Sequence, residues 1–354
     1  MKKVKLGQLV SIQTGKLDAN AAVFGGKYPF FTTAKEISRI NEYAYDGEVV
    51  LVAGNGDLNV KYYKGKFNAY QRTYILTSNS NVRMKYLYYF LDKYIEVLRY
   101  QSIGGVIKYI KLNNLSDAQI PMRSIFEQDK IIGILEKLDN EIIIRSKQLS
   151  ELSNLVKSRF NEMFGDIFDN PQSKLEDHIE LNPNKKELQN FNGDVSFLPM
   201  SNVSENGKID LSINRNIDDV RKGFTFFKDN DVIVAKITPC FENGKGAPVF
   251  GLLNGVGFGS TEFHVLRPKN TVNTVWLYHV TMLSKFRLEG ERKMTGSGGQ
   301  RRITKDFINN FKLNIPPLSL QNEFADFVAQ VDKSQFACQM AIKLWRNSLK
   351  SSII

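Results

Sequence analysis

The sequence predicts an α+β fold made by tandem duplication, in which a mixed α/β globular part followed by a long helix occurs twice. Three observations predict it. Short strings recur in the same order, and each repeat ends in an apolar pattern of coiled-coil type. The excess of basic residues lies on the globular parts, outside these apolar patterns. With 42% hydrophobic residues among 354, the chain can fill two cores of ordinary size, which excludes fibrous and disordered classes.

Five short strings recur in register between the two halves. They keep the positions of their apolar residues even where the polar residues between them differ. One such match could arise by chance, but five in the same order indicate duplication. The matched pairs are 5–12 with 174–181, 46–52 with 229–235, 86–89 with 276–279, Gly104-Gly105 with Gly298-Gly299, and 128–139 with 321–332.

The first globular part reads as strands followed by a helix. Val49–Val52 and Arg72–Leu76 are short β-branched or aromatic runs bounded by turn-forming residues, which predicts strands. Tyr86–Tyr100 has a helical pattern. Loops dense in Gly, Lys, Asn and Tyr lie between the strands at Gly54–Asp57 and Lys61–Lys66. This part is also shorter before its central strand than the second copy is.

A heptad seam follows each globular part. From Ile131 to Val156 the apolar residues step by four and three, with Arg145 at one step, and the second copy places Gln335 at one step. These two polar residues either fix the register of the helices or face a third protein. The predicted seam residues are Ile131, Leu135, Leu138, Ile142, Leu149 and Leu152 in the first helix, and Phe324, Val328, Val331, Ile342, Trp345 and Leu349 in the second.

The two helices are the obvious partners for each other's stripes. A helix of about 40 residues is roughly 60 Å long. We therefore expect an antiparallel coiled-coil pair that separates the globular parts and relates them by a pseudo-two-fold axis. Ser124 and Ser319 are the predicted N-caps, each just after a proline, and Gly165 is predicted to end the first helix.

The second globular part repeats the first with different loops. Val232–Ala235 and Glu262–Leu266 are predicted strands, and Val275–Leu288 is a predicted helix. Lys236–Pro239 and Asn243–Gly246 replace the loops of the first copy. The predicted domains are residues 1–118 and 171–314 for the globular parts, and 119–170 and 315–354 for the spacer helices.

The charge distribution favours a polyanionic partner. Residues 1–120 carry 17 basic and 9 acidic side chains, and residues 173–315 carry 20 and 16, whereas residues 121–172 carry 7 and 9. The net charge of +11 thus lies mainly on the globular parts. The alternative is that these charges serve solubility alone.

The loops carry the candidate binding residues. Cations among aromatic and amide side chains can bind the phosphates and the base edges of DNA. A framework that stays the same while its loops differ is expected of two domains that bind different targets. Alternatively the loops are ordinary β-turns, and the glycine segments are linkers rather than phosphate-binding loops. The candidate DNA-binding residues are Lys61, Lys64, Arg72 and Lys108 in the first half, and Lys236, Lys245, Gln300, Arg301 and Arg302 in the second.

Motifs for catalysis, metal binding or membrane insertion are not found in the sequence. Glu291-Arg292-Lys293 has the spacing of a nuclease motif but lacks the preceding Pro-Asp, and the three histidines are scattered. No stretch approaches the roughly 18 apolar residues of a membrane span. Cys240 and Cys338 form no disulfide framework, which predicts a reducing, cytoplasmic location.

The order of these features resembles the specificity subunit of type I restriction-modification systems. The resemblance is carried by Ile120-Pro121 with Ser124 and Gln128, by Ile315–Leu318 through Gln321 and Asp332, and by 298–306. It spans essentially the whole chain. It implies two target recognition domains, each reading one half of an asymmetric bipartite site in double-stranded DNA, with the paired helices setting the unread spacer.

The resemblance also implies the partners and the division of chemistry. Methyltransferase (modification) subunits would dock on the helices and use S-adenosylmethionine, and a restriction/translocase subunit would use ATP and Mg. The chain itself would be non-catalytic, with no cofactor and no metal of its own. Two alternatives remain open from the sequence, namely a partner in which methyltransferase and nuclease are fused, and a coiled-coil interaction scaffold without a DNA role. An enzymatic role for the chain alone ranks last.

Overall fold

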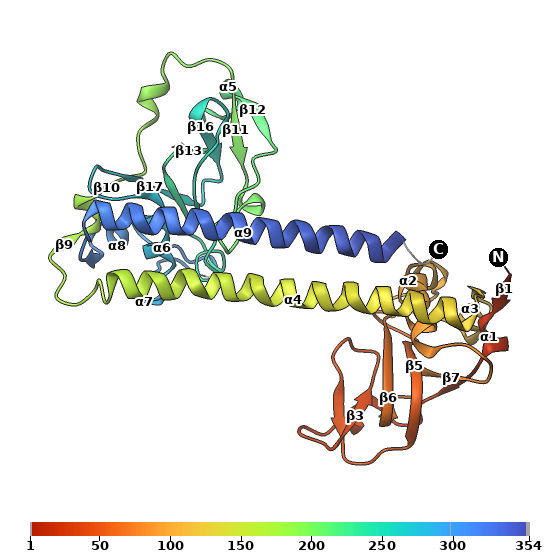
Figure 1. Cartoon of the computed structure of the whole chain (residues 1–354). Coiled ribbons are helices and arrows are strands. Elements are labelled where there is room, and N and C mark those ends of the chain that lie inside the picture. The colour runs from red at the N-terminus through yellow and green to blue at the C-terminus, as the bar shows by residue number, and fades with distance from the viewer. Residues whose placement is uncertain (1, 298, 352–354) are drawn as a thin grey trace. The chain divides into compact units, whose positions relative to one another are not determined.

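The computed structural model describes residues 2–297 and 299–351 (Figure 1). Gly298 of the glycine segment and the last three residues of the second spacer lie outside the described residues. The described chain divides into two compact units. One holds the residues up to Gln148 with those from Cys338 onward, and the other holds residues 149–337. Each unit thus contains one globular part and a portion of both long helices, and the domain boundaries taken from the repeat stay predictions.

A six-stranded sheet forms the first globular part. Its order is β2-β7-β5-β6-β3-β4, and all neighbours are antiparallel except β3 and β6. A two-stranded ladder joins β1 to β8. The strands are β1 (Lys3–Lys5), β2 (Val10–Thr14), β3 (Tyr28–Phe31), β4 (Ser38–Ile40), β5 (Tyr45–Ala53), β6 (Val60–Ala69), β7 (Thr73–Ser78) and β8 (Gln119–Pro121), and the helices are α1 (Leu6–Leu9), α2 (Met84–Gln101) and α3 (Leu112–Ser116).

Helix α2 packs on this sheet through one apolar face. Leu87, Leu91 and Leu98 are fully buried and share a core with Val50 and Val52 of β5. The leucines recur at helical spacing and the valines at strand spacing, so each element presents one face to the other. The core of the first part therefore lies between α2 and the sheet.

Within the described part of the chain, the second globular part contains two four-stranded sheets. One has the order β10-β17-β14-β15 and is antiparallel, and the other has the order β12-β11-β16-β13, with β11 and β16 parallel. A ladder pairs β9 with β18. The strands are β9 (Ser173–Lys174), β10 (Ile179–Leu181), β11 (Asp194–Leu198), β12 (Asn214–Asn216), β13 (Thr225–Lys228), β14 (Val232–Ala235), β15 (Gly246–Pro248), β16 (Val256–Gly259), β17 (Phe263–Pro268) and β18 (Lys312–Leu313), and the helices are α5 (Ile217–Val220), α6 (Thr274–Met282), α7 (Ser284–Arg292) and α8 (Lys305–Asn309).

The two globular parts share one strand arrangement. The order β2-β7-β5-β6 repeats as β10-β17-β14-β15, and the parallel pair β3–β6 repeats as β11–β16. Strands β5 and β6 are continuous in the first part. In the second part their counterparts are divided, β13 from β14 by Asp229–Asp231 and β15 from β16 by Val249–Gly255. One sheet therefore becomes two, and the duplication seen in the sequence is confirmed in the fold.

The predicted elements are found with two corrections, the first being that the predicted loop at Lys61–Lys66 is wrong, because these residues lie within strand β6. The four predicted strands lie within or beside β5, β7, β14 and β17, and the predicted helix Tyr86–Tyr100 lies within α2. The single helix predicted at Val275–Leu288 is wrong, because Leu283 is extended (φ −64°, ψ 141°) and separates α6 from α7. Leu283 is neither Gly nor Pro, so the sequence carries no sign of the break.

Two long helices, α4 (Ile125–Phe164) and α9 (Leu318–Ser351), follow the globular parts. Ser124 caps α4, because its hydroxyl accepts from the Glu127 N–H at 3.3 Å while the Glu127 carboxylate accepts from the Ser124 N–H at 2.9 Å. Gly165, at φ +59°, ends this helix as predicted. The prediction of Ser319 as N-cap is wrong. The helix begins at Leu318, before Ser319, and the Pro317 carbonyl accepts from the N–H groups of Leu320 and Gln321.

The two helices pack antiparallel within each unit. In one unit Phe160 and Phe324 stack edge to face with centroids 5.4 Å apart, and Gln335 donates to the Ser153 hydroxyl at 3.2 Å. In the other, the guanidinium of Arg145 lies 6.0 Å from the Trp345 ring centroid. Arg145 and Gln335 are both engaged inside the seam, as a role in fixing register requires.

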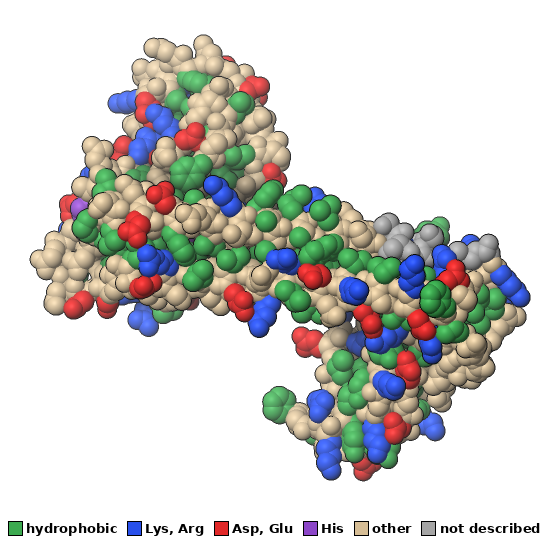
Figure 2. All heavy atoms as spheres, in the orientation of Figure 1, with side chains coloured by type: hydrophobic (Ala, Val, Ile, Leu, Met, Phe, Trp, Pro, Cys, Tyr) green, Lys and Arg blue, Asp and Glu red, His purple; other side chains and the backbone are tan. Residues whose placement is uncertain are grey.

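The predicted seam residues face inward. All of those named from the sequence are buried or half-buried. Other apolar side chains of α4 and α9 are exposed. Figure 2 shows hydrophobic side chains on the visible face along the helices. Neither these nor any other helix in the described part of the chain is long and apolar enough to cross a membrane.

A buried glutamine joins each long helix to its globular part. The amide oxygen of Gln128 accepts from the Arg83 N–H and its amide nitrogen donates to the carbonyl five residues earlier, both at 2.9 Å. Gln321 repeats this with the Asn273 N–H and the carbonyl of Pro316, both at 2.8 Å. Arg83 and Asn273 are the N-caps of α2 and α6. Each glutamine lies in the first turn of a long helix and accepts a hydrogen bond from the N-cap N–H of a helix in the globular part.

Candidate nucleic-acid interface

In the first half, the loop after β5 pairs with a glycine hairpin. Ile103 and Tyr109 exchange two backbone hydrogen bonds, of 3.0 and 2.8 Å, and so close the hairpin. The Gly56 N–H donates to the Lys108 carbonyl, and the Ile110 N–H donates to the Gly54 carbonyl, both at 2.9 Å. The two segments, predicted from the sequence as separate candidate loops, thus form one surface.

The second half repeats this pairing after β14. Thr295 and Arg302 close the hairpin through bonds of 2.9 and 2.8 Å. The Thr238 N–H donates to the Arg301 carbonyl, and the Ile303 N–H donates to the Lys236 carbonyl, both at 2.9 Å. The backbone frame of the candidate interface is therefore the same in both halves, although the side chains differ.

This shared frame corrects the register predicted for the glycines. The matched hydrogen bonds make Ile103 equivalent to Thr295, so Gly104 corresponds to Gly296 rather than to Gly298. Gly104 and Gly296 have φ of +115° and +118°, and a Cβ on either would lie under 3 Å from a carbonyl oxygen inside the hairpin. Only glycine fits this turn without strain. The same register makes Lys108 equivalent to Arg301.

The predicted cations of the first half differ in their freedom to bind. Lys64, Arg72 and Lys108 are exposed. The ammonium of Lys61 is engaged, because it donates to the Ala34 carbonyl at 2.7 Å and also to the amide oxygen of its neighbour Asn59. Burial lowers the pKa of Lys61. Lys61 therefore supports the loop rather than offering a free charge.

The second half shows the same division. Arg302 forms two bonds with the Glu262 carboxylate, at 2.8 and 2.9 Å, and these bonds lower the pKa of Glu262. Lys245 donates to the Met200 carbonyl at 3.3 Å, and Lys236 is half-buried. Gln300 is exposed, and the side chain of Arg301 is less tightly held, with Glu242 at 3.8 Å and Glu291 at 4.0 Å.

Arg301 and Arg302 are expected to respond differently to alanine substitution. On the hypothesis from the sequence that these loops bind DNA, Arg301→Ala should weaken binding at the second half about tenfold without changing the melting temperature, because a loosely held cation is lost. Arg302→Ala should lower the melting temperature, since Glu262 loses its partner. Fluorescence anisotropy and thermal unfolding would measure the two effects, and Glu262→Gln should reproduce only the second. Equal melting temperatures for Arg301→Ala and Arg302→Ala would contradict this division.

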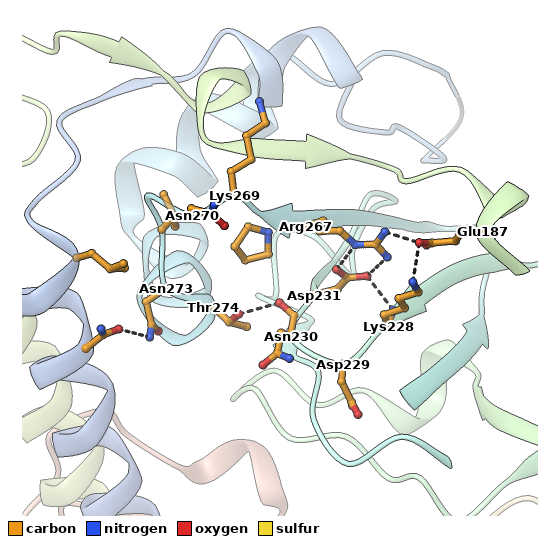
Figure 3. A pocket seen from close by; sticks show the side chains of 14 residues that line it. Glu187, Lys228, Asp229, Asn230, Asp231, Arg267, Lys269, Asn270, Asn273 and Thr274 are labelled. Carbon is orange, nitrogen blue, oxygen red and sulfur yellow. Dashed lines mark hydrogen bonds and ion pairs between the residues drawn. The ribbon is translucent and has the colours of Figure 1, made fainter. Parts of the chain in front are cut away.

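A polar cavity of about 780 Å³ opens elsewhere in the second globular part (Figure 3). On its wall Arg267 binds both oxygens of Asp231, at 2.8 and 2.9 Å, and also Glu187 at 3.0 Å. Lys228 donates to the same Glu187 at 2.6 Å. These charges satisfy one another, and the Asp231 side chain is only 1% exposed. The cluster therefore braces the sheets and offers no free charge to a ligand.

Lysine and arginine side chains are mixed with acidic ones on the face of the molecule seen in Figure 2. On this face the basic side chains do not single out the paired loops, which are distinguished instead by their repeated backbone frame. Within residues 2–297 and 299–351 no group of three or more His, Cys, Asp or Glu side chains could hold a metal ion.

Sequence reasoning missed the exposed apolar residues of the first hairpin, Val106 and Ile107. Their position directly after Gly104-Gly105, in a segment already identified as a loop, was the signal that could have found them. Lys35 and Arg99 were also missed as the cations that neutralise Asp57 beside this hairpin, at 3.0 Å each. No sequence spacing links these three residues.

Comparisons with known proteins agree with the duplication. A family model described as the type I restriction modification DNA specificity domain matches residues 1–154 and again residues 172–343. The EcoDI specificity subunit of Escherichia coli, a type I restriction enzyme subunit, is 39% identical over 161 residues, which are 46% of this chain and 36% of that protein. The EcoAI specificity subunit of the same organism is 41% identical over 145 residues, 40% of this chain and 24% of that protein. The matches thus span about a quarter to a third of the length of these relatives.

The fold has a counterpart among solved structures. The crystal structure of the S subunit of a type I restriction-modification system from M. genitalium superposes with a TM-score of 0.61 at 15% identity, covering 100% of this chain and 96% of that one. This likeness concerns the fold. Because the family model covers nearly all of the chain in two copies, one for each globular part with its helix, the chain belongs to the type I restriction-modification DNA specificity family.

Proposed function

We propose that the chain is the DNA-recognition subunit of a type I restriction-modification complex, in which each globular part reads one half of a bipartite, asymmetric site. The observation that carries the proposal is the paired loop surface, repeated bond for bond in both halves but presenting different side chains. A shared frame positions two readers in the same way, and different side chains give them different targets. Family membership and the specificity subunits among its relatives support the same reading.

The proposal assigns the chemistry to partner subunits. Methyltransferase subunits dock on α4 and α9 and act on adenine with S-adenosylmethionine, and a restriction/translocase subunit uses ATP and Mg. The exposed apolar side chains of these helices, such as Ile144 and Leu344, support a docking role, since a coiled coil of two helices needs only its inner stripe. The chain itself binds and positions the DNA and has no catalytic residue.

Single-molecule sequencing of a host that expresses the chain with its neighbouring methyltransferase tests the proposal. A bipartite adenine-methylation motif is expected when both proteins are present and is expected to vanish when the chain is deleted. If the methyltransferase is active and its methylation pattern does not depend on the chain, the proposal is wrong and the chain is an interaction scaffold. A scaffold would bind DNA only weakly, without sequence preference and with full loss in salt.

A further inference from the structure

The hairpin of the first half presents an apolar tip to solvent. Val106 is 104% exposed relative to an extended reference, and Ile107 is 63% exposed. A Cβ placed on Gly105 would meet no atom within 4 Å, so the backbone beside them is also open. Further exposed apolar side chains lie around the hairpin at Tyr100, Ile103, Tyr109 and Leu112. Such a group of apolar side chains on an exposed surface marks a binding site.

The hairpin of the second half has the same frame and a polar tip. Its described tip residues are Gly296, Ser297, Gly299, Gln300 and Arg301. Among the described residues between Ser284 and Lys305, Leu288 is the one large apolar side chain that is exposed, at 52%. Since both hairpins close through equivalent hydrogen bonds, an apolar tip is not needed to fold the hairpin. The difference therefore concerns what each tip contacts.

The surroundings of the apolar tip suit a polyanion. The sequence from Val97 to Ser116 contains no Asp or Glu, while it contains Arg99, Lys108 and Lys111. Asp57, which lies on the loop paired with the hairpin, is neutralised by Lys35 and Arg99, each at 3.0 Å. Lys108 is exposed next to Ile107. An apolar tip flanked by cations matches proteins that insert aliphatic side chains between base pairs while their cations bind the phosphates.

We propose that Val106 and Ile107 form an apolar wedge that inserts between base pairs of the first half-site, whereas the second half binds through Gln300 and Arg301 without insertion. This inference rests on the proposed function. The wedge belongs to one half of a duplicated chain, so it fits a ligand whose two halves differ. A partner protein bound alike by both halves would need the feature twice.

The test uses the chain assembled with its methyltransferase partner and a duplex carrying the motif found by methylation mapping. 2-Aminopurine is placed in turn at each adenine-compatible step of both half-sites, because its fluorescence rises when a base is unstacked. Apart from the target adenines, which the methyltransferase itself unstacks when it acts on them, the complex should raise the fluorescence at one step of the first half-site. The double variant Val106→Ser, Ile107→Ser should abolish this rise and weaken binding about tenfold or more, since the buried apolar surface is lost. Val106→Leu, Ile107→Leu should retain both properties.

Leu288→Ser is the matched control, because it removes an exposed apolar side chain from the half with the polar tip. Its fluorescence profile and affinity should equal those of the parent complex. The wedge is overturned if the double serine variant keeps the fluorescence rise and the affinity. It is also overturned if that variant binds DNA normally but no longer assembles with the methyltransferase, which would make the tip a protein interface. If no motif depends on the chain at all, the proposed function itself fails and the wedge fails with it.

Discussion

Replacing Gln321 by leucine is expected to lower the free energy of unfolding by about 3 kcal/mol, and replacing Gln128 by about 2 kcal/mol. Both side chains are fully buried. Leucine fills a similar volume but leaves the bonded backbone groups without partners in a site that water does not reach. Gln321 satisfies three such groups, the Asn273 N–H and the carbonyls of Thr271 and Pro316, whereas Gln128 satisfies two in the bonds described above. Guanidinium denaturation of the full chain would measure both losses.

Gln335→Leu is the control for these substitutions. Gln335 lies on α9 like Gln321, but it is partly exposed and makes a 3.2 Å bond to the Ser153 hydroxyl. Its replacement should change the free energy of unfolding by no more than about 0.5 kcal/mol. If Gln321→Leu lowers the free energy of unfolding by no more than Gln335→Leu does, the hydrogen bonds of Gln321 do not hold α9 to its globular part.

The unit that holds the second globular part is expected to lose stability as the pH falls below 6.5. His264 is buried and neutral, with Nε2 3.1 Å from the Ile303 carbonyl and Nδ1 3.1 Å from the Asn182 amide. Burial lowers its pKa from 6.5 to about 4. Between these values the unfolded chain binds a proton that the folded chain does not. The free energy of unfolding therefore decreases as the pH is lowered, and the loss reaches roughly 3 kcal/mol once the pH is below about 4.

A second histidine adds to this loss. Burial also lowers the pKa of His279 to about 4, beside the rings of Phe160 and Phe324. All three histidines of the chain lie in residues 149–337, so the other unit should not share the effect between pH 6.5 and 5. Hydrogen exchange should show protection lost in β17 and α6 but kept in β5 and α2.

His279→Tyr is the informative variant, because Tyr89 occupies the equivalent position in the first half. It should reduce the slope of stability against pH in this window, and His264→Gln should reduce it further, whatever either substitution does to stability at neutral pH. A slope that is unchanged in both variants would show that neither histidine causes the acid sensitivity.

The sequence predicted the fold well where a pattern is local. The β-branched runs found β5 and β14, the helical pattern found α2, and Ser124 found the start of α4. The patterns failed where a distant contact or the backbone itself decides. Leu283 interrupts a run of helix-forming residues without any breaker, and α9 begins at Leu318, before the predicted cap at Ser319.

The sequence predicted which segments form the candidate interface, but not which of their side chains are free to bind. The glycine hairpins were found because they combine Gly with basic and polar residues, and Gly54–Gly56 and Lys236–Thr238 are bonded to them, whereas the predicted loop at Lys61–Lys66 is part of strand β6. Which cations are free could not be read from the sequence. Arg302 is held by Glu262, 40 residues away, and Lys61 is held by the carbonyl of Ala34, 27 residues away. Such pairs depend on the sheet that brings the segments together, and their spacing carries no signal.

We propose that one duplicated frame carries two independent readers. Methylation mapping by single-molecule sequencing tests it most directly, in a host that carries the chain with its active methyltransferase, before and after residues 1–118 are exchanged for the first globular part of another family member. We expect a bipartite adenine motif in which only one half changes after the exchange. A motif that changes in both halves, or in neither, would contradict it.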